Sequence, residues 1–409
     1  MSNYGSNYQN IGMSQAMDAG KARSRKSKFI IIGSVVGLLV LAAIGIAVGV
    51  TVSNNNKKNA STSGSSSSSS SGSGGNSNTG STTGGTKSDP NDPSNFTKDP
   101  NLHQAFYGMA YTPEGALIEF GCTNTLESVI QDIQLMSQLT KRVRLYGADC
   151  NQTAQVLEAI TRTNVDMEVF VGIYNVADDN HAAYQRQRDL IKDAISTYGT
   201  KHIGGITVGN EFMLNYVTDK AISDVNSADA QVGADILIAD IKDAKQMVQD
   251  LKLDKAIPVG NSDAGSYFPT TVMEAMDYGL SNVHAWFAHT TATAAAPWVF
   301  NFFQETNVSP AALLANKPQM YIAETGWPTK SSDAKNANNG GSDASVPNLQ
   351  IFLDDFVCKA NQDGVRYFFF EMFDEEWKDV KFGGVEGWWG LFNKDRTLKD
   401  VKIPTCTSP

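Results

Sequence analysis

From residue 106 onward the sequence alternates short apolar segments with longer amphipathic ones, and this alternation restricts the possible fold more than any other feature. Eight segments have the length and composition of buried strands: residues 106–111, 142–146, 167–173, 203–208, 256–259, 283–287, 320–323 and 366–370. Helix-like segments lie between them, several with apolar residues at three- and four-residue spacing, for example 126–139, 184–198, 236–251 and 349–361. Alternation of this kind is typical of a parallel sheet covered by helices.

Eight strand and helix units predict a TIM (β/α)8 barrel within residues 102–409. About 305 residues are available for it, which is enough for one large domain with a complete core. A doubly wound parallel sheet is the alternative fold, but no G-x-G-x-x-G motif follows any of the expected strands. A nucleotide site therefore has no support in the sequence.

The first hundred residues have a different character. Residues 29–52 contain no charged side chain and are long enough to cross a bilayer as a helix. A cleaved signal peptide is the alternative, but 28 residues precede the apolar segment. Five basic residues lie within 21–28 and only Lys57 and Lys58 follow the segment, so the positive-inside rule predicts that residues 1–28 form a cytoplasmic tail. We expect a single-pass type II protein of the plasma membrane.

Residues 53–101 are predicted to form a flexible linker rich in Ser, Thr and Gly. None of the 35 residues at 61–95 is aliphatic, aromatic, Met or Cys, so this stretch has nothing with which to build a core. N-glycosylation sequons begin at Asn95, Asn151 and Asn307, as expected for an exported chain.

The charge of the chain limits the partners it could bind, and its cysteines indicate disulfides. Beyond residue 60 the chain has 26 basic and 42 acidic side chains, an excess that argues against a nucleic-acid partner. The four cysteines show no C-x-x-C spacing, so we expect two disulfides in an oxidising compartment rather than a metal site. Three pairings are possible, and proximity in sequence favours Cys122 with Cys150 and Cys358 with Cys406.

Two glutamates follow apolar strands and are the candidate catalytic residues. Glu324 ends the strand at 320–323 and precedes a Gly-Trp-Pro turn, and Glu211 follows the strand at 203–208. A single glutamate of this kind is more often a helix cap or a surface ion-pair partner. A pair at the ends of barrel strands is different, because the carboxyl ends of all eight strands meet at the active-site face.

Further side chains are expected to face the same cleft as substrate contacts. Trp327 lies in the turn after Glu324, where its indole face would stack on a sugar ring. The other candidates are Tyr146, Asn210, Trp286, Phe287, Glu371 and Lys378. Packing inside the barrel is an equal alternative for Tyr146 and Phe287. The histidines at 284 and 289 are interpreted as structural, and no H-E-x-x-H, G-x-S-x-G or P-loop motif is present.

Four motifs together resemble glycoside hydrolase family 17, the β-1,3-glucanases and related glucan-remodelling enzymes of plants and fungi. They are Val-Gly-Asn-Glu at 208–211, Ala-Glu-Thr-Gly-Trp-Pro at 323–328, Met-Phe-Asp-Glu at 372–375 and Trp-Gly-Leu-Phe at 389–392. The resemblance implies that Glu211 is the acid/base and Glu324 the nucleophile of a retaining enzyme, with no metal or organic cofactor. In a retaining glycosidase the two carboxyl groups lie about 5 to 5.5 Å apart.

The resemblance extends to the N-terminal region, whose basic tail, single span and serine-rich linker are similar to those of membrane-anchored fungal members of the family. It implies β-1,3-glucan as substrate and a catalytic domain that faces the cell wall. We expect the chain to be monomeric. Glu371 and Lys378 are implied only as sugar contacts, since this chain departs from the family pattern at 375–377.

Three functions remain open at this point. The first is an endo-acting β-1,3-glucanase, which passes the sugar to water. The second is a glucanosyltransferase, which passes it to the hydroxyl of another glucan chain. The third is a non-catalytic wall-binding protein, which the linker and several tryptophans would suit but which has no need of the two glutamates.

Overall fold

The computed structural model describes residues 88, 89 and 91–409. The predicted cytoplasmic tail, the predicted span at 29–52 and most of the predicted linker lie outside these residues. Among the helices of the described residues, none has both the length and the apolar character needed to cross a membrane. The last part of the predicted linker forms a small antiparallel hairpin of β1 (Ser88–Asp89) and β2 (Asp92–Phe96), and β2 contacts helix α4.

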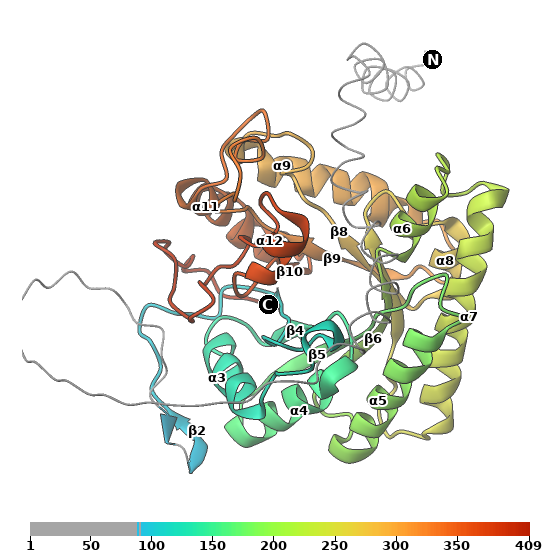
Figure 1. Ribbon diagram of the computed structural model, residues 1–409, viewed down its shortest axis with the longest axis horizontal. Coiled ribbons are helices and arrows are strands. Elements are labelled where there is room, and N and C mark those ends of the chain that lie inside the picture. Colours follow the sequence, from blue (N-terminus) through green and yellow to red (C-terminus); the bar gives the residue numbers. More distant parts are fainter. Residues whose placement is uncertain (1–87, 90) are drawn as a thin grey trace, which may run out of the picture. The chain divides into compact units, whose positions relative to one another are not determined.

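Eight parallel strands close into a barrel, which confirms the predicted TIM fold (Figure 1). The strands are β3 (Gly108–Ala110), β4 (Arg142–Arg144), β5 (Glu168–Ile173), β6 (Ile203–Asn210), β7 (Val259–Ala264), β8 (Tyr278–Asn282), β9 (Gln319–Thr325) and β10 (Tyr367–Phe369). Neighbours in the chain are neighbours in the sheet, and β10 pairs with β3 to complete the circle.

Two strands differ from the prediction. The predicted strand at 256–259 lies mostly before β7, and the predicted strand at 283–287 lies entirely after β8. Both observed strands contain polar residues, for example the Asn-Ser-Asp run of β7, and these side chains are buried. A search for apolar segments passed over them because their polar side chains face partners inside the domain instead of solvent.

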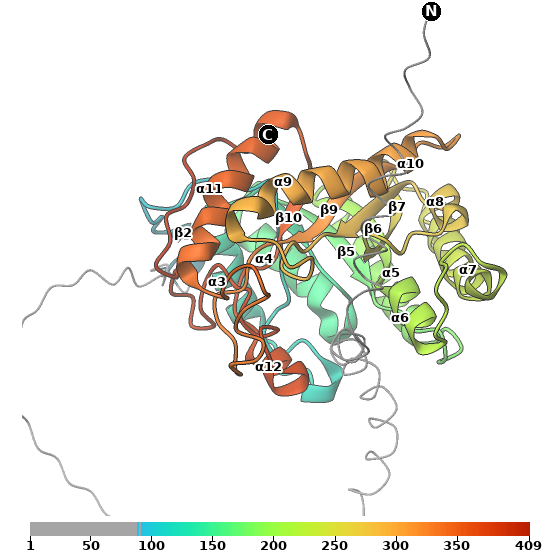
Figure 2. The ribbon, with the colours of Figure 1, turned by 90° about the horizontal axis from the view of Figure 1, so that it is seen from above.

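Helices surround the strands, as Figure 1 shows. Their bounds are α3 (Leu126–Met136), α4 (Gln152–Thr163), α5 (Ala182–Tyr198), α6 (Phe212–Asp219), α7 (Ala228–Asp250), α8 (Thr270–Ala275), α9 (Ala292–Phe303), α10 (Ser309–Ala312), α11 (Val346–Asp363) and α12 (Glu376–Phe382). Short helical turns η2 (Ile118–Phe120), η3 (Asp149–Asn151) and η4 (Gln304–Val308) complete the set. Figure 2 shows α6 and α12 on the same side of the barrel and the C-terminus on the opposite side.

Aromatic rings from β5, β8, β9 and β10 pack together inside the barrel. Phe170 lies at the centre of this cluster, with its ring centroid 5.2 Å from that of Phe368, 5.7 Å from Tyr278 and 5.8 Å from Tyr321. All four side chains are buried. Because side chains alternate along a strand, residues two positions further toward the carboxyl ends point inward above this layer, which therefore forms the floor of the barrel mouth.

Two disulfides form, and both have the pairing that the sequence favoured. Cys122 bonds Cys150 and links the loop after β3 to η3, while Cys358 on α11 bonds Cys406 in the C-terminal segment. The backbone N–H of Ser408 also donates to the carbonyl of Gln104 at 3.0 Å. The end of the chain is therefore fastened beside the segment that leads into β3.

Candidate active site

Glu211 and Glu324 lie at the carboxyl ends of β6 and β9. Glu211 is the first residue after β6 and has a left-handed backbone conformation with φ of 55°, whereas Glu324 is still part of its strand and is 6% exposed. Asn282, the last residue of β8, connects them. It lies opposite Glu324 in the register of β8 and β9, and its amide Nδ2 donates to Oε1 of Glu211 at 3.0 Å.

Arg144 holds Glu324 from inside the barrel. Its guanidinium donates to Oε1 of Glu324 at 2.8 Å and to Oδ1 of Asn210 at 2.7 Å, and also to Oγ of Ser262 at 2.8 Å. The arginine is 1% exposed, so this ion pair forms away from bulk water, where a charge needs such partners. The sequence analysis missed Arg144, although an arginine in the middle of a predicted barrel strand was a visible signal.

His284 holds the other oxygen of Glu324. Its Nε2 lies 3.0 Å from Oε2, and because an ionised carboxylate can only accept, Nε2 is the donor. The interpretation of His284 as merely structural is therefore wrong. His289 bonds the backbone carbonyl of Asn339 through Nδ1 instead and does not contact the glutamates.

The two glutamates differ in acidity. Burial, reinforced by the negative charge of Glu324, raises the pKa of Glu211 to about 7. Burial acts in the same direction on Glu324, but the hydrogen bond from His284 and the charge of Arg144 outweigh it and lower the pKa of Glu324 to about 2. Between these values one carboxyl group holds a proton while the other is ionised, which is the division of states that paired-carboxylate chemistry requires.

Two of the predicted contacts join this cluster directly. The Tyr146 ring stacks on the Arg144 guanidinium, whose carbon lies 4.2 Å from the ring centroid. Burial and the charge of Glu324 raise the pKa of the Tyr146 hydroxyl well above its ordinary range. Asn210 accepts from Arg144, as described above, and is only partly buried. Both side chains therefore lie beside the glutamates.

A second group of charged side chains lies after β10 and includes two more of the predicted contacts, Glu371 and Lys378. Nζ of Lys378 lies 2.7 Å from Oε2 of Glu371 and 3.3 Å from Oε2 of Glu375. Burial and the charge of Glu375 raise the pKa of Glu371 well above its usual range. Burial raises the pKa of Glu386, a residue that the sequence analysis did not consider, and the charges of Lys378 and Glu324 act on this pKa as well.

The tryptophans are where the structure corrects the prediction. Trp327 is fully buried, its Nε1 donates to the carbonyl of Asp343 at 3.0 Å, and its ring meets that of Trp286 edge to face with centroids 5.3 Å apart. The Gly-Trp-Pro turn folds the indole under the loop that precedes α11, so it cannot stack on a sugar. Trp286 is 5% exposed and belongs to the same packed pair.

Phe287 supplies the exposed aromatic surface instead. Its side chain is 51% exposed, and its ring lies 5.9 Å from the His284 ring and 6.0 Å from that of Trp389, measured between centroids. Since His284 bonds Glu324, Phe287 lies at the edge of the glutamate cluster. A flat apolar ring in this position can contact the C–H face of a pyranose.

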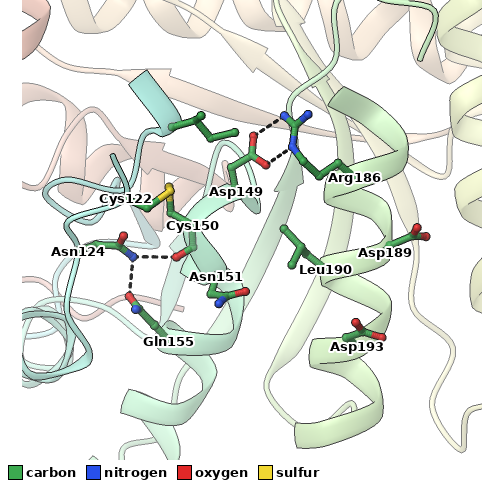
Figure 3. Close-up of a pocket in the computed structure, with 11 residues that line it drawn as sticks. Cys122, Asn124, Asp149, Cys150, Asn151, Gln155, Arg186, Asp189, Leu190 and Asp193 are labelled. Atoms are coloured by element: carbon green, nitrogen blue, oxygen red, sulfur yellow. Dashed lines mark hydrogen bonds and ion pairs between the residues drawn. A yellow bond between two sulfur atoms is a disulfide. The ribbon is translucent and has the colours of Figure 1, made fainter. Parts of the chain in front are cut away.

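A separate cavity of about 640 Å³ lies away from the glutamates (Figure 3). It is bordered by the Cys122–Cys150 disulfide and by a bidentate ion pair in which Arg186 donates to Asp149 at 2.7 and 2.8 Å. Neither Glu211 nor Glu324 lines it. Within the described part of the chain, no group of three or more His, Cys, Asp or Glu side chains could hold a metal ion.

The sequence of this domain matches a known family and several curated proteins. Residues 108–390 match the BtgE/BtgC glycoside hydrolase domain. A probable glucan endo-1,3-beta-glucosidase btgC of Aspergillus flavus is 35% identical over 340 residues, which are 80% of this chain and 47% of that protein. The glucan endo-1,3-beta-glucosidase btgC of Emericella nidulans is 34% identical over 321 residues, 75% of this chain and 47% of that protein. The chain thus spans about half the length of these curated relatives.

Solved structures share the fold at lower identity. A Rhizomucor miehei beta-1,3-glucanosyltransferase, an active-site mutant in complex with laminaritriose, is 24% identical with a TM-score of 0.59 and covers 74% of this chain and 99% of its own. An endo-laminarinase from Formosa is 19% identical with a TM-score of 0.57, covering 71% of this chain and 84% of its own.

Proposed function

The chain belongs to the BtgE/BtgC glycoside hydrolase family, and from that membership we propose that it is a retaining glycosidase that cleaves internal β-1,3-glucosidic bonds of cell-wall glucan. The names of its relatives from Aspergillus flavus and Emericella nidulans support this activity and substrate. The four sequence motifs described above support a finer placement in glycoside hydrolase family 17. One of the solved structures with this fold, a β-1,3-glucanosyltransferase of Rhizomucor miehei, is itself a family 17 member.

The observation that carries the proposal is the opposite shift in acidity of Glu211 and Glu324. A retaining glycosidase needs one protonated carboxyl group to assist the leaving oxygen and one carboxylate to attack the sugar. Glu211, with its pKa raised to about 7, suits the first role, and Glu324, with its pKa lowered to about 2, suits the second. A wall-binding protein without catalysis would have no need of this difference.

In the first step, an oxygen of Glu324 attacks the anomeric carbon while Glu211 transfers its proton to the glycosidic oxygen, and the bond between that carbon and oxygen breaks. Arg144 and His284 hold the Glu324 carboxylate in place and keep it ionised until it attacks. Asn210, whose oxygen is bound by Arg144, is left with an amide N–H₂ that can donate to the 2-hydroxyl of the sugar.

The second step reverses the role of Glu211. Once Glu324 is esterified to the sugar, its negative charge is gone, and that charge was one cause of the raised pKa of Glu211. The pKa of Glu211 therefore falls, and the carboxylate can take a proton from the incoming hydroxyl. Attack of that oxygen on the anomeric carbon frees Glu324, and two inversions leave the β configuration unchanged.

Further contacts with the glucan are proposed for residues around the glutamates. Phe287 offers its exposed ring to a sugar face, and Tyr146 borders the same cluster. Lys378 is held between two carboxylates and is 13% exposed, so its ammonium can reach a sugar hydroxyl, with Glu371 as the group that holds it there. No metal or organic cofactor is required by this scheme.

The experiment that tests the function is incubation of the full chain with defined β-1,3-gluco-oligosaccharides, with product lengths measured by mass spectrometry. Hydrolysis gives shorter products only, and we expect this result. Products longer than the substrate would identify a glucanosyltransferase, and an unchanged substrate would favour the wall-binding alternative. Glu324→Gln is the matched inactive control, because it removes the nucleophilic charge with almost no change in volume.

We also propose that the enzyme is monomeric and is anchored in the plasma membrane by residues 29–52, with the barrel facing the cell wall. The uneven distribution of basic residues around that segment supports this orientation. The two disulfides support it as well, since such bonds persist in oxidising compartments. Protease added to intact cells should release an active barrel by cutting within 61–95, whereas a barrel that stays protected until lysis would contradict the proposal.

A further inference from the structure

Glu211 occupies a position where its side chain would ordinarily bond its own backbone. It is the N-cap residue of α6, and an N-cap side chain usually accepts from the N–H of the second or third helical residue. The Glu211 carboxyl group makes no such bond. It bonds Asn282 and faces the barrel mouth instead, so something else has to satisfy the first turn of α6.

Asp263 supplies the missing acceptor from a neighbouring strand. Its Oδ2 accepts from the N–H of Met213 at 2.8 Å, and its Oδ1 accepts from the N–H of Leu214 at 3.2 Å. Phe212 is the first residue of α6, so these two donors are at the second and third positions. Oδ1 also accepts from the N–H of Ala264 at 2.9 Å, and Asp263 is fully buried.

We propose that Asp263 is a positioning residue that caps α6 in place of Glu211 and thereby leaves the Glu211 carboxyl group free to transfer its proton at the glycosidic oxygen. The inference rests on the proposed function. It assigns to β7 a role that the glutamates themselves do not reveal: the carboxyl group of Asp263 binds the helix backbone, so that the carboxyl group of Glu211 does not have to.

The physical consequence of losing Asp263 supports this role. The N–H of Met213 would be left buried without an acceptor, and such a group costs about 1 to 3 kcal/mol unless it finds one. The Glu211 carboxyl group belongs to the N-cap of the same helix and is within reach by rotation of its own side chain. Glu211 would turn back onto α6 and leave Asn282. The enzyme would keep its nucleophile but lose its oriented acid.

The test compares two substrates, one with a leaving group that needs an acid and one with a leaving group that does not. One is a β-1,3-gluco-oligosaccharide, and the other is a laminaribioside of 2,4-dinitrophenol, whose leaving group departs without protonation. We expect Asp263→Ala to lower kcat/KM on the oligosaccharide by about 100-fold, at the lower end of what general acid catalysis contributes. On the dinitrophenyl substrate the loss of kcat/KM should be less than about tenfold. Azide should restore turnover of the dinitrophenyl substrate by the Asp263→Ala variant and yield a β-glycosyl azide. Azide attacks the glycosyl-enzyme without help from a general base, which water needs.

A second substitution guards against misfolding. Asp263→Asn keeps the shape and one acceptor oxygen, so it should fold and show a smaller change with the same preference for the dinitrophenyl substrate. The matched control is Asp132→Asn on α3, which removes another buried carboxylate that accepts from Tyr111 at 2.6 Å and Arg396 at 2.7 Å. That control should lower Tm without changing the ratio between the two substrates or responding to azide.

Equal losses on both substrates for Asp263→Ala and Asp263→Asn, with no azide response, would overturn the inference and leave Asp263 as a structural residue. A crystal structure of Asp263→Ala with Glu211 still bonded to Asn282 and a normal rate on both substrates would overturn it too. If the unaltered protein cleaves neither substrate, the proposed function fails, and the inference fails with it for that separate reason.

Discussion

Nε2 of His284 lies 3.0 Å from Oε2 of Glu324, whereas Arg144 binds the other oxygen of the same carboxylate, Oε1. Each oxygen of the proposed nucleophile therefore has its own donor, one from β4 and one from the segment after β8. This arrangement keeps Glu324 ionised in a buried site where an unpartnered carboxylate would take up a proton.

The pH dependence of kcat/KM should follow the two shifted acidities. Activity requires ionised Glu324 and protonated Glu211, so it is lost as the pH falls through about 2 and lost as the pH rises through about 7. His284→Asn removes a side chain that lowers the pKa of both glutamates, so both limbs of the profile should move to higher pH. Initial rates on a β-1,3-gluco-oligosaccharide, whose leaving group needs the acid, measure the shift across a pH series. An unmoved acidic limb would contradict the assignment.

Substitutions of the two glutamates should impair different steps of the reaction. Glu324→Gln should abolish turnover, by about 10⁴-fold or more, while glucan binding measured by calorimetry is retained. Glu211→Ala should still form the glycosyl-enzyme from the dinitrophenyl substrate and then stall, which intact mass spectrometry would detect as a covalent adduct. Proton NMR of the first-formed product decides the stereochemistry: an initial α-anomer would mean inversion and would remove Glu324 as the nucleophile.

Substitution of Trp327 should affect stability, whereas substitution of Phe287 should affect substrate binding, because the first side chain is buried and the second is exposed. Trp327→Ala empties a fully buried site and should destabilise the fold by about 3 to 5 kcal/mol, measured by chemical denaturation. Phe287→Ala removes an exposed ring and should leave stability within about 0.5 kcal/mol while raising KM for gluco-oligosaccharides. A stable Trp327→Ala variant with a raised KM would restore the original stacking prediction.

Glu211 should reduce the stability of the enzyme at neutral pH. Its pKa rises from an ordinary value of 4.5 to about 7 on folding, so the unfolded chain loses this proton first and stability falls as the pH rises between these values. Glu211→Gln cannot ionise and should be more stable than the parent by up to about 3 kcal/mol at pH 8, with a gain of less than about 1 kcal/mol at pH 5. Urea denaturation at both pH values measures it, and a gain independent of pH would point to packing instead of charge.

The sequons at Asn95, Asn151 and Asn307 should differ in occupancy, and a fourth, at Asn59, lies outside the described residues. Asn307 is fully buried, donates to the carbonyl of Gly265 and accepts from Ser281, each at 2.8 Å, so a glycan there is incompatible with the fold. Asn95 and Asn151 are exposed, and Asn151 borders the cavity of Figure 3. Peptide mapping by mass spectrometry before and after endoglycosidase treatment should find glycans at Asn95 and Asn151 and none at Asn307. Asn151→Gln should remove one, and a glycan found at Asn307 would contradict this reading of the fold.

The sequence predicted the barrel and both disulfides because each depends on a regular pattern or on proximity along the chain. It also singled out Glu211 and Glu324, since the carboxyl ends of barrel strands lie together at the active-site face. It misplaced β7 and β8, whose buried polar residues serve other parts of the molecule. It missed the partnership of Arg144 and His284 with Glu324, because residues 180 and 40 positions from the glutamate are brought beside it only by closure of the barrel. The burial of Trp327 likewise depends on Asp343 in a later loop.

Pairing of β3 with β10 has a consequence for how the chain is made. Gly108 and Phe368 are partners in the sheet although 260 residues separate them, so one edge of β3 has no strand to pair with until the end of the domain has been synthesised. At typical rates of about 5 to 20 residues per second, this interval lasts roughly 13 to 52 s. Cys122 and Cys150 can join early in it, whereas Cys406 must wait for the last residues. The nascent chain thus carries an open sheet edge for many seconds, and its yield should depend on chaperones that shield that edge more than on the stability of the finished barrel.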